Sequence, residues 1–179
     1  MIKTAIFGGK FDPPHLAHQI IIFLLFAKHK IDEVFVVPSF SHAFGYDSTS
    51  FELRLKMADF LAKPWGNSVK ILDIEKNIGK EPVYSIDLLE ALNMMGGDRE
   101  FYFVIGEDNY KLREKWKDFD KIEAMAKIIV IGRGTSFENY FPMPDISSSL
   151  IREMILAGKD VSHLLPDGLS EFILKKKIY

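Results

Sequence analysis

Short apolar runs alternate along the chain with longer segments in which apolar residues recur at helical spacing. The runs are rich in Val, Ile and Phe and have almost no polar interruption, which predicts strands buried on both faces. They cover residues 2–8, 33–38, 69–74, 100–106 and 127–131. The helical segments cover residues 15–29, 51–62, 85–95, 118–126, 147–157 and 168–177. This alternation predicts an α/β fold in which a five-stranded parallel sheet carries helices on both faces.

The length of 179 residues suits one domain with a substantial core and is short for two. The sequence has no internal repeat, low-complexity segment or linker, so we expect a single domain over residues 1–179. The apolar run at residues 20–27 is too short to cross a bilayer, and the first residues do not resemble a signal peptide. No membrane partner is therefore expected.

Composition excludes several classes of chemistry. The sequence contains no cysteine, which excludes disulfides, zinc-thiolate sites and thiol nucleophiles and fits a cytoplasmic location. The formal net charge of −2 leaves no basic surplus for a nucleic-acid surface. We therefore expect a cytoplasmic protein without a nucleic-acid partner.

The stretch GGKFDPPHLAH, residues 8–18, follows the first predicted strand, and ligands of parallel sheets bind beyond the carboxyl ends of the strands. Gly8 and Gly9 allow the backbone to approach an anion closely. The start of the next helix offers N–H groups and the positive end of the helix dipole. His15 and His18 are three residues apart and lie on one face near that end. Two such donors can hold the oxygens of a transferring phosphoryl group.

Two other interpretations of this stretch are a packed or solvated histidine pair and a metal site. Two histidines without a nearby third ligand make a poor zinc site, although Asp12 is available. No protein-held metal is predicted. The glycines form neither a dinucleotide fingerprint nor a Walker loop, because G-x-G-x-x-G and G-K-[ST] are absent.

A second candidate anion site lies at ISSSLIR, residues 146–152. Ser147 and Ser148 stand at the start of a predicted helix, where serines cap the helix and leave N–H groups pointing outward. Arg152 follows about one turn further along, and a helix start with an Arg is typical of a phosphate site. Taken alone, the segment also fits a plain capped helix with a surface Arg.

The two segments together, G-G-x-F-D-P-P-H-x-x-H and I-S-S-S-x-I-R, resemble the nucleotidyltransferase superfamily that carries the (T/H)xGH motif. Within it the chain is similar to bacterial nicotinate-mononucleotide adenylyltransferases. The resemblance extends nearly end to end, through residues 82–87, 103–108, 129–133, 165–168 and 178–179. It implies a Rossmann-like fold and adenylyl transfer from ATP to nicotinate mononucleotide in NAD biosynthesis, with Mg²⁺ carried on the ATP phosphates.

The resemblance also implies roles for individual residues. His15, His18 and Arg152 would be catalytic, with His18 stabilising the α-phosphoryl group. Residues implied to bind ATP are Gly8, Gly9, Phe11, His15, His18, Gly106, Asp108, Arg133, Ile146, Ser147, Ser148 and Arg152. Residues implied to bind the mononucleotide are Ser39, His42, Tyr84, Ser85 and Trp116. Ser85 would lie by the nicotinate carboxylate and Trp116 would stack on the pyridine ring, although a core Trp is the alternative.

Three positions depart from the family pattern, of which Ala17, where the family usually has Gly, is a mild change. The loop after the second strand has His42 but lacks the basic residue that the family places over the phosphates, and the next basic residue is Arg54. Lys10 stands where the family's G-G-(T/S)-F-D segment has a hydroxyl. Our hypothesis is that Lys10 is catalytic and supplies the missing cation; the alternative is a Lys that points outward.

The altered second loop leaves the acceptor open, because that loop faces the acceptor in the family. Nicotinamide mononucleotide, phosphopantetheine or another phosphomonoester is an alternative acceptor, and cytidylyl transfer is an alternative reaction. A nucleotide-binding protein without catalysis is the alternative from another class.

Overall fold

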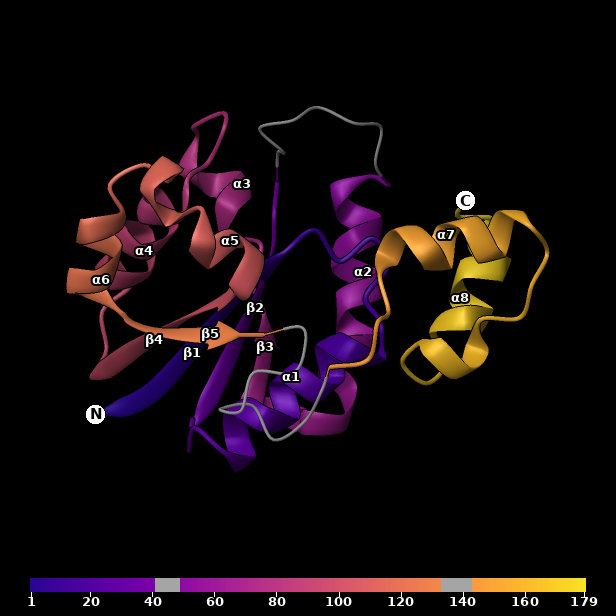
Figure 1. Cartoon of the computed structure of the whole chain (residues 1–179), viewed down its shortest axis with the longest axis horizontal. Helices are drawn as coiled ribbons and strands as arrows, with labels where there is room; N and C mark the ends of the chain where they lie inside the picture. Colours follow the sequence, from indigo (N-terminus) through magenta and orange to yellow (C-terminus); the bar gives the residue numbers. More distant parts are fainter. Residues whose placement is uncertain (41–48, 133–142) are drawn as a thin grey trace.

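The computed structural model describes residues 1–40, 49–132 and 143–179. Its sheet has five parallel strands in the order β3-β2-β1-β4-β5. The strands are β1 (Ile2–Gly9), β2 (Glu33–Pro38), β3 (Val69–Ile71), β4 (Arg99–Gly106) and β5 (Lys127–Ile131). Because β1 is central, the loop that follows it leaves the middle of the sheet (Figure 1). The predicted α/β class and five-stranded parallel sheet are confirmed.

Helices connect the strands and continue beyond the sheet. The α-helices are α1 (Leu16–Ala27), α2 (Phe51–Ala62), α3 (Ile74–Ile78), α4 (Ser85–Met94), α5 (Glu107–Lys111), α6 (Phe119–Met125), α7 (Ser148–Leu156) and α8 (Leu169–Lys176). Single 3₁₀ segments are η1 (Lys63–Ser68), η2 (Arg113–Lys115) and η3 (Ser162–Leu164). Every helix that the apolar spacing predicts is present, with ends that differ by one or two residues.

The predicted strand over residues 69–74 divides into β3 and the start of α3. Leu72, Ile74 and Ile78 pack against the core that α4 and α6 cover, so the apolar residues after Ile71 serve a short helix rather than a longer strand. α5 was not predicted either, because its sequence EDNYK has no apolar period.

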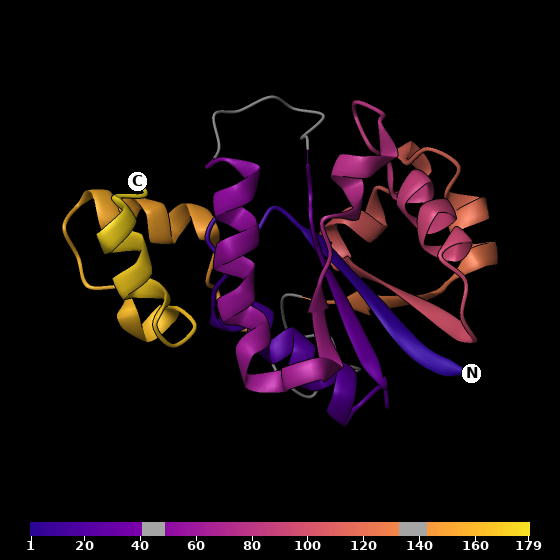
Figure 2. The same cartoon turned by 180° about the vertical axis from the view of Figure 1, so that it is seen from behind.

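Alternate residues of the central strand face opposite layers. Ala5 and Phe7 belong to a core that α1 and α2 cover, to which Ile22 and Leu61 contribute. Ile6 points the other way, into the core that α4 and α6 cover. Helices therefore lie on both faces of the sheet, as predicted (Figure 2). Within the residues that the structure describes, no helix is long and apolar enough to cross a membrane.

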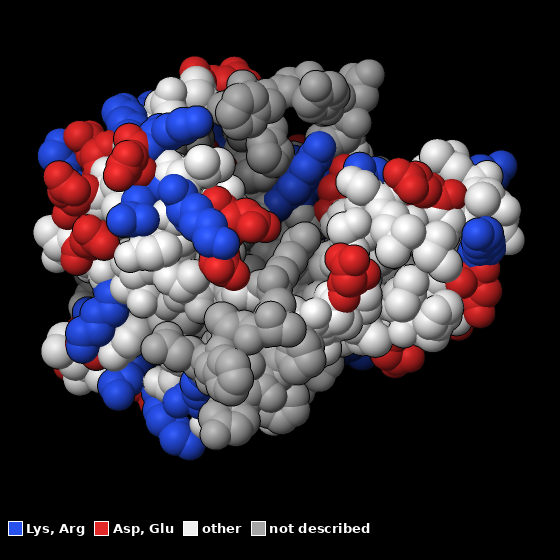
Figure 3. Space-filling view, viewed as in Figure 1, with Lys and Arg blue, Asp and Glu red and all other residues white. Residues whose placement is uncertain are grey.

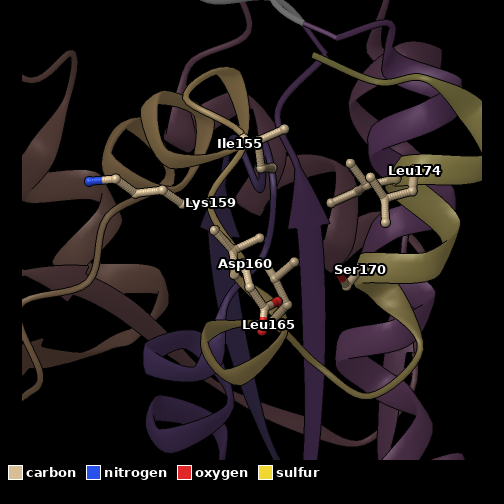
Figure 4. Close-up of a pocket in the computed structure, with 9 residues that line it drawn as sticks. Ile155, Lys159, Asp160, Leu165, Ser170 and Leu174 are labelled. Carbon is tan, nitrogen blue, oxygen red and sulfur yellow. The ribbon is translucent and has the colours of Figure 1, made fainter.

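α7 and α8 form a third apolar cluster beside α2, away from the sheet (Figures 1 and 2). Ile151, Leu169 and Ile173 pack there with Met57 of α2. A pocket of about 300 Å³ lies in this part, lined by residues from 155–165 and 170–174. Figure 4 shows the Lys159 side chain pointing away from the other lining residues. This pocket contains none of the residues predicted for the site.

A buried carboxylate links four strands at the edge of the sheet where the strands begin, opposite the edge from which the loop after β1 leaves. Glu33 of β2 accepts hydrogen bonds from Thr4 of β1 at 2.9 Å, from Lys70 of β3 at 2.8 Å and from Arg99 of β4 at 2.8 Å. Burial by itself would raise the pKa of Glu33, but these three hydrogen bonds outweigh burial and hold the pKa below its usual value. The carboxylate is therefore stabilised in its charged form.

Candidate active site

The loop after β1 folds back on an aromatic side chain. Phe11 has a left-handed φ of 50° and is only 2% exposed. A Cβ at Gly9 would come within 3.1 Å of the Phe11 ring, so a residue with a side chain at this position would displace it. A Cβ at Gly8, in contrast, would meet no atom of the described residues within 4 Å. Gly9 thus serves the packing of the loop, whereas none of the described residues crowds the Gly8 backbone.

His15 and His18 form the start of α1 together. His15 is the N-cap residue, and the two residues make a reciprocal capping box in which the His15 N–H donates to His18 Nδ1 at 3.1 Å. The rings stack with their centroids 3.8 Å apart. Because Nδ1 of His18 accepts this bond, the neutral ring carries its proton on Nε2, which is a donor. The predicted placement of both imidazoles at the helix start is confirmed.

The start of α7 is bonded to the same loop, from about 140 residues further along the chain. Ser147 is the N-cap of α7 and accepts from the N–H of Leu150 at 3.2 Å. The Ser148 hydroxyl donates to the Pro13 carbonyl at 2.8 Å. Arg152 donates through Nη1 to the Asp12 carbonyl at 2.6 Å. The two segments that the sequence suggested as anion sites therefore lie side by side.

Asp12 is the centre of this junction and is 2% exposed. Its Oδ1 accepts from the Tyr179 hydroxyl at 2.6 Å, and its Oδ2 accepts from the Thr49 N–H at 3.3 Å. Burial, followed by the hydrogen bond to Asp12, raises the pKa of Tyr179 far above its usual value, so the hydroxyl keeps its proton and remains a donor. Among the described residues, no cluster of three or more His, Asp or Glu side chains is arranged to hold a metal ion.

Arg54 of α2, a residue not predicted for the site, also reaches this region. It is 3% exposed and donates to the carbonyls of Lys10, Ser39 and Thr49. The signal was available in the sequence, because Arg54 follows Phe51 by three residues and precedes Met57 by three, on the apolar face of a predicted helix. A charged residue on such a face needs buried partners.

The starts of α4 and α5 lie at the carboxyl edge of the sheet. Gly106 ends β4, the neighbour of β1, and is the N-cap of α5, in whose first turn Asp108 lies exposed. Tyr84 is the N-cap of α4 and Ser85 is its first residue. The Lys117 ammonium lies 4.7 Å from the centroid of the Tyr84 ring, which brings the segment after η2 to the start of α4.

An ion pair between a buried carboxylate and an exposed lysine holds the first turn of α4. Asp87 accepts from the Tyr84 N–H at 3.0 Å and pairs with Lys80. Burial opposes the charged form of this carboxyl, but the bonds from Lys80 and Tyr84 outweigh burial and keep the pKa of Asp87 below its usual value. The position of Tyr84 is thereby set by hydrogen bonding within the turn.

Trp116 is partly buried at the edge of the core. Its ring meets those of Phe103 and Phe119 edge to face, at centroid distances of 6.2 and 6.0 Å. The Trp116 ring therefore has a packing role, and contact with a ligand stays a prediction.

On the face seen in Figure 3, acidic and basic side chains are interspersed rather than gathered by sign.

A family model for cytidylyltransferase-like proteins matches residues 6–154 of the chain. The chain belongs to the cytidylyltransferase-like family. It is 32% identical to a protein of Anaeromyxobacter dehalogenans named as a nicotinate-nucleotide adenylyltransferase, over 99% of this chain and 96% of that protein. A relative of the same name from Myxococcus xanthus is 32% identical over 92% of this chain and 88% of its own length.

Solved structures agree with this membership of the family. A crystal structure described as a nicotinate-nucleotide adenylyltransferase of Vibrio parahaemolyticus superposes with a TM-score of 0.79 at 27% identity, covering 97% of this chain and 99% of that one. A nicotinic acid mononucleotide adenylyltransferase of Plasmodium falciparum, complexed with NaAD, has a TM-score of 0.75 at 20% identity, covering 100% and 98%. The latter supports the fold alone.

The remaining residues predicted for the site lie partly inside and partly outside the described residues. His42 and Arg133 lie outside the described residues. The Ser39 N–H donates to the Gly9 carbonyl at 2.9 Å, so the loops after β1 and β2 are adjacent. Ile146 is partly buried against the cluster of α7 and α8. The Lys10 carbonyl accepts from Arg54, whereas a role for the Lys10 ammonium stays a prediction.

Proposed function

We propose that the chain transfers the adenylyl group of ATP to nicotinate mononucleotide, forming the deamido-NAD dinucleotide and pyrophosphate in NAD biosynthesis. The observation that carries this proposal is the junction of the loop after β1 with the start of α7 through Ser148 and Arg152, which brings together the two candidate anion-binding segments. The full-length similarity to relatives named for this activity supports the same reaction.

In the proposed reaction, an oxygen of the acceptor phosphate attacks the α-phosphorus of ATP. The bond from that phosphorus to its bridging oxygen breaks, and pyrophosphate leaves. A displacement of this kind needs positioned groups and charge stabilisation rather than a covalent enzyme intermediate. Mg²⁺ enters with ATP as part of the substrate, bound by phosphate oxygens.

His18 and Arg152 have the main roles in this proposal. The Nε2–H of His18 donates to an oxygen of the α-phosphoryl group, where negative charge grows in the transition state. His15 fixes the tautomer of His18 through its backbone N–H and contributes to the same anion site. The N–H groups at the start of α7 and the guanidinium of Arg152 hold the β and γ phosphates, which leave.

The two substrates are recognised at the neighbouring loops. Asp108, two residues beyond the end of β4, accepts from the ribose hydroxyls of ATP, with Gly106 near it. Ser85 and Trp116 hold the pyridine part of the acceptor. The positive charge of Lys117 over Tyr84 favours an acceptor that carries a carboxylate over one that carries an amide.

A second candidate function is the same transfer to another phosphomonoester. The observation behind it is the loop after β2, which has no Lys or Arg between Ser39 and Arg54. Arg54 does not replace that cation, because its guanidinium is buried and bonded to three backbone carbonyls.

Pyrophosphate release from Mg-ATP tests both candidates, with nicotinate mononucleotide, nicotinamide mononucleotide and phosphopantetheine compared side by side. The proposal expects turnover with nicotinate mononucleotide at a kcat/KM well above the other two. Preference for another acceptor would support the second candidate. Binding of ATP without release of pyrophosphate from any acceptor would contradict both.

A further inference from the structure

Arg54 joins three segments of the candidate active site through backbone carbonyls. Its Nη1 donates to Lys10 in the loop after β1 at 3.0 Å and to Ser39 in the loop after β2 at 2.8 Å. Its Nε donates to Thr49, next to the N-cap of α2, at 3.0 Å. Arg54 thus bonds the described residues on both sides of 41–48 to the loop after β1, in addition to the direct bonds from the Ser39 N–H to Gly9 and from the Thr49 N–H to Asp12.

The two loops that Arg54 joins have different proposed substrates. The loop after β1 carries Lys10 and leads to His15 and His18, which face ATP in the proposed reaction. Ser39 begins the loop on the acceptor side, and the N–H of its neighbour Phe40 donates to Glu75 of α3 at 2.8 Å. The backbone at Ser39–Phe40 is therefore held by Arg54 on one side and by Glu75 on the other.

A buried guanidinium is a costly way to tie loops together if stability is the only gain. Within the described residues, its three hydrogen bonds go to neutral carbonyls, and desolvation disfavours its charged form, although the charges of Asp12 and Glu75 lie near it. Apolar residues of similar volume often replace buried charged groups without loss of stability. An apolar side chain at this position could not supply the three directed hydrogen bonds that Arg54 makes.

We propose that Arg54 is a positioning residue for adenylyl transfer, fixing the loop after β1, on the proposed ATP side, relative to Ser39 beyond the end of β2, on the proposed acceptor side. This inference rests on the proposed function. In-line attack requires the reacting oxygen and phosphorus to be aligned within a narrow range, and a displacement of about 1 Å can reduce the rate about 100-fold. The planar fork of Arg bonds two carbonyls through one nitrogen and a third through Nε. A Lys ammonium is a single point donor and cannot reproduce this arrangement.

The experiment compares Arg54→Lys and Arg54→Met with Lys56→Met, a control on the exposed face of the same helix. Three quantities are measured for each variant: the Tm, the Kd for α,β-methylene-ATP, and kcat and KM with nicotinate mononucleotide well below the Tm. We expect kcat to fall about 100-fold in both Arg54 variants. The Kd for the ATP analogue should stay within about threefold, because the His pair and α7 remain in place.

A kcat within about threefold of wild type, with only the Tm lowered, would show that Arg54 is merely structural and would overturn the inference. A loss confined to the Kd for the ATP analogue would also overturn it, because Arg54 would then act on one substrate and not on their relative position. Arg54→Lys keeps the charge, so it remains informative if Arg54→Met does not fold. A wild-type chain that releases no pyrophosphate would contradict the proposed function itself, which separates the two failures.

Discussion

The ATP side and the acceptor side of the candidate active site are built differently. On the ATP side, Arg152 and Ser148 bond to backbone carbonyls of the loop after β1, and His15 and His18 cap one helix together. On the proposed acceptor side, Trp116 is held by aromatic packing, and Tyr84 is 40% exposed with its ring beside a Lys ammonium. On the proposed ATP side, polar bonds of fixed direction thus hold the chain segments to one another, while on the proposed acceptor side aromatic contacts hold the Trp116 ring.

The largest effect should come from removing the donor at the centre of the ATP side. We expect His18→Ala to lower kcat for pyrophosphate release about 100- to 1,000-fold, as loss of one donor to a developing charge does elsewhere. The capping bond is lost too, at about 1 kcal/mol, which lowers the Tm by about 2–4 °C. His163→Ala on exposed η3 is the control. A His18→Ala enzyme with near-normal turnover would disprove the role.

Arg152→Met should come next, with kcat/KM for ATP about 30- to 100-fold lower, because a charged donor to the leaving phosphates is lost. The KM for the acceptor should change little, since Arg152 belongs to the ATP side. Steady-state kinetics with each substrate varied in turn will show this split, with Lys159→Met as the control. An equal rise of both KM values would mean that the two sides are not distinct.

Lys10→Thr tests whether the ATP side compensates for the altered acceptor loop. We expect kcat/KM to fall about tenfold or more if the ammonium contacts a phosphate. Lys63→Thr, at an exposed position after α2, is the matched control. An unchanged kcat/KM would assign Lys10 to the alternative of a Lys that points outward.

The smallest effect concerns the acceptor side and depends on pH. Burial raises the pKa of Glu75 to about 6, against 4.5 for the ordinary side chain, despite the bond from Phe40 and the charge of Arg54. Since the folded pKa is the higher one, the stabilising contribution is complete below pH 4.5 and is lost as the pH rises through about 6. We expect Glu75→Gln to gain Tm relative to wild type between pH 5 and pH 7, by a few degrees. Thermal unfolding at both pH values measures this, and a pH-independent difference would refute it.

Much of the fold follows from local patterns, because the strands are buried on both faces and the helices show a clear apolar period. The order of the strands does not follow from local patterns, because pairing between β1 and β4 depends on contacts across nearly 100 residues. The apolar pattern did not predict α3 and α5, because helices of five residues contain too few apolar positions to show a period.

The candidate site likewise contains residues that the sequence reveals and residues that only the folded structure reveals. Gly8, His18 and Arg152 lie in motifs that local spacing or resemblance reveals. The partners of Asp12 do not, because Tyr179 and Thr49 come from distant segments that only folding brings together. Arg54 lies between these cases, since its place on an apolar helix face is visible in the sequence while its carbonyl partners are not.

The carboxylate of Glu33 accepts hydrogen bonds at the edge of the sheet where the strands begin. The proposed substrate loops leave the opposite edge, where the strands end. Selection for thermal tolerance and selection for substrate choice can therefore act on opposite ends of the same strands. Substitutions around Glu33 could raise thermal stability without altering the proposed substrate loops. Substitutions in those loops could change the acceptor while the ion cluster stays the same.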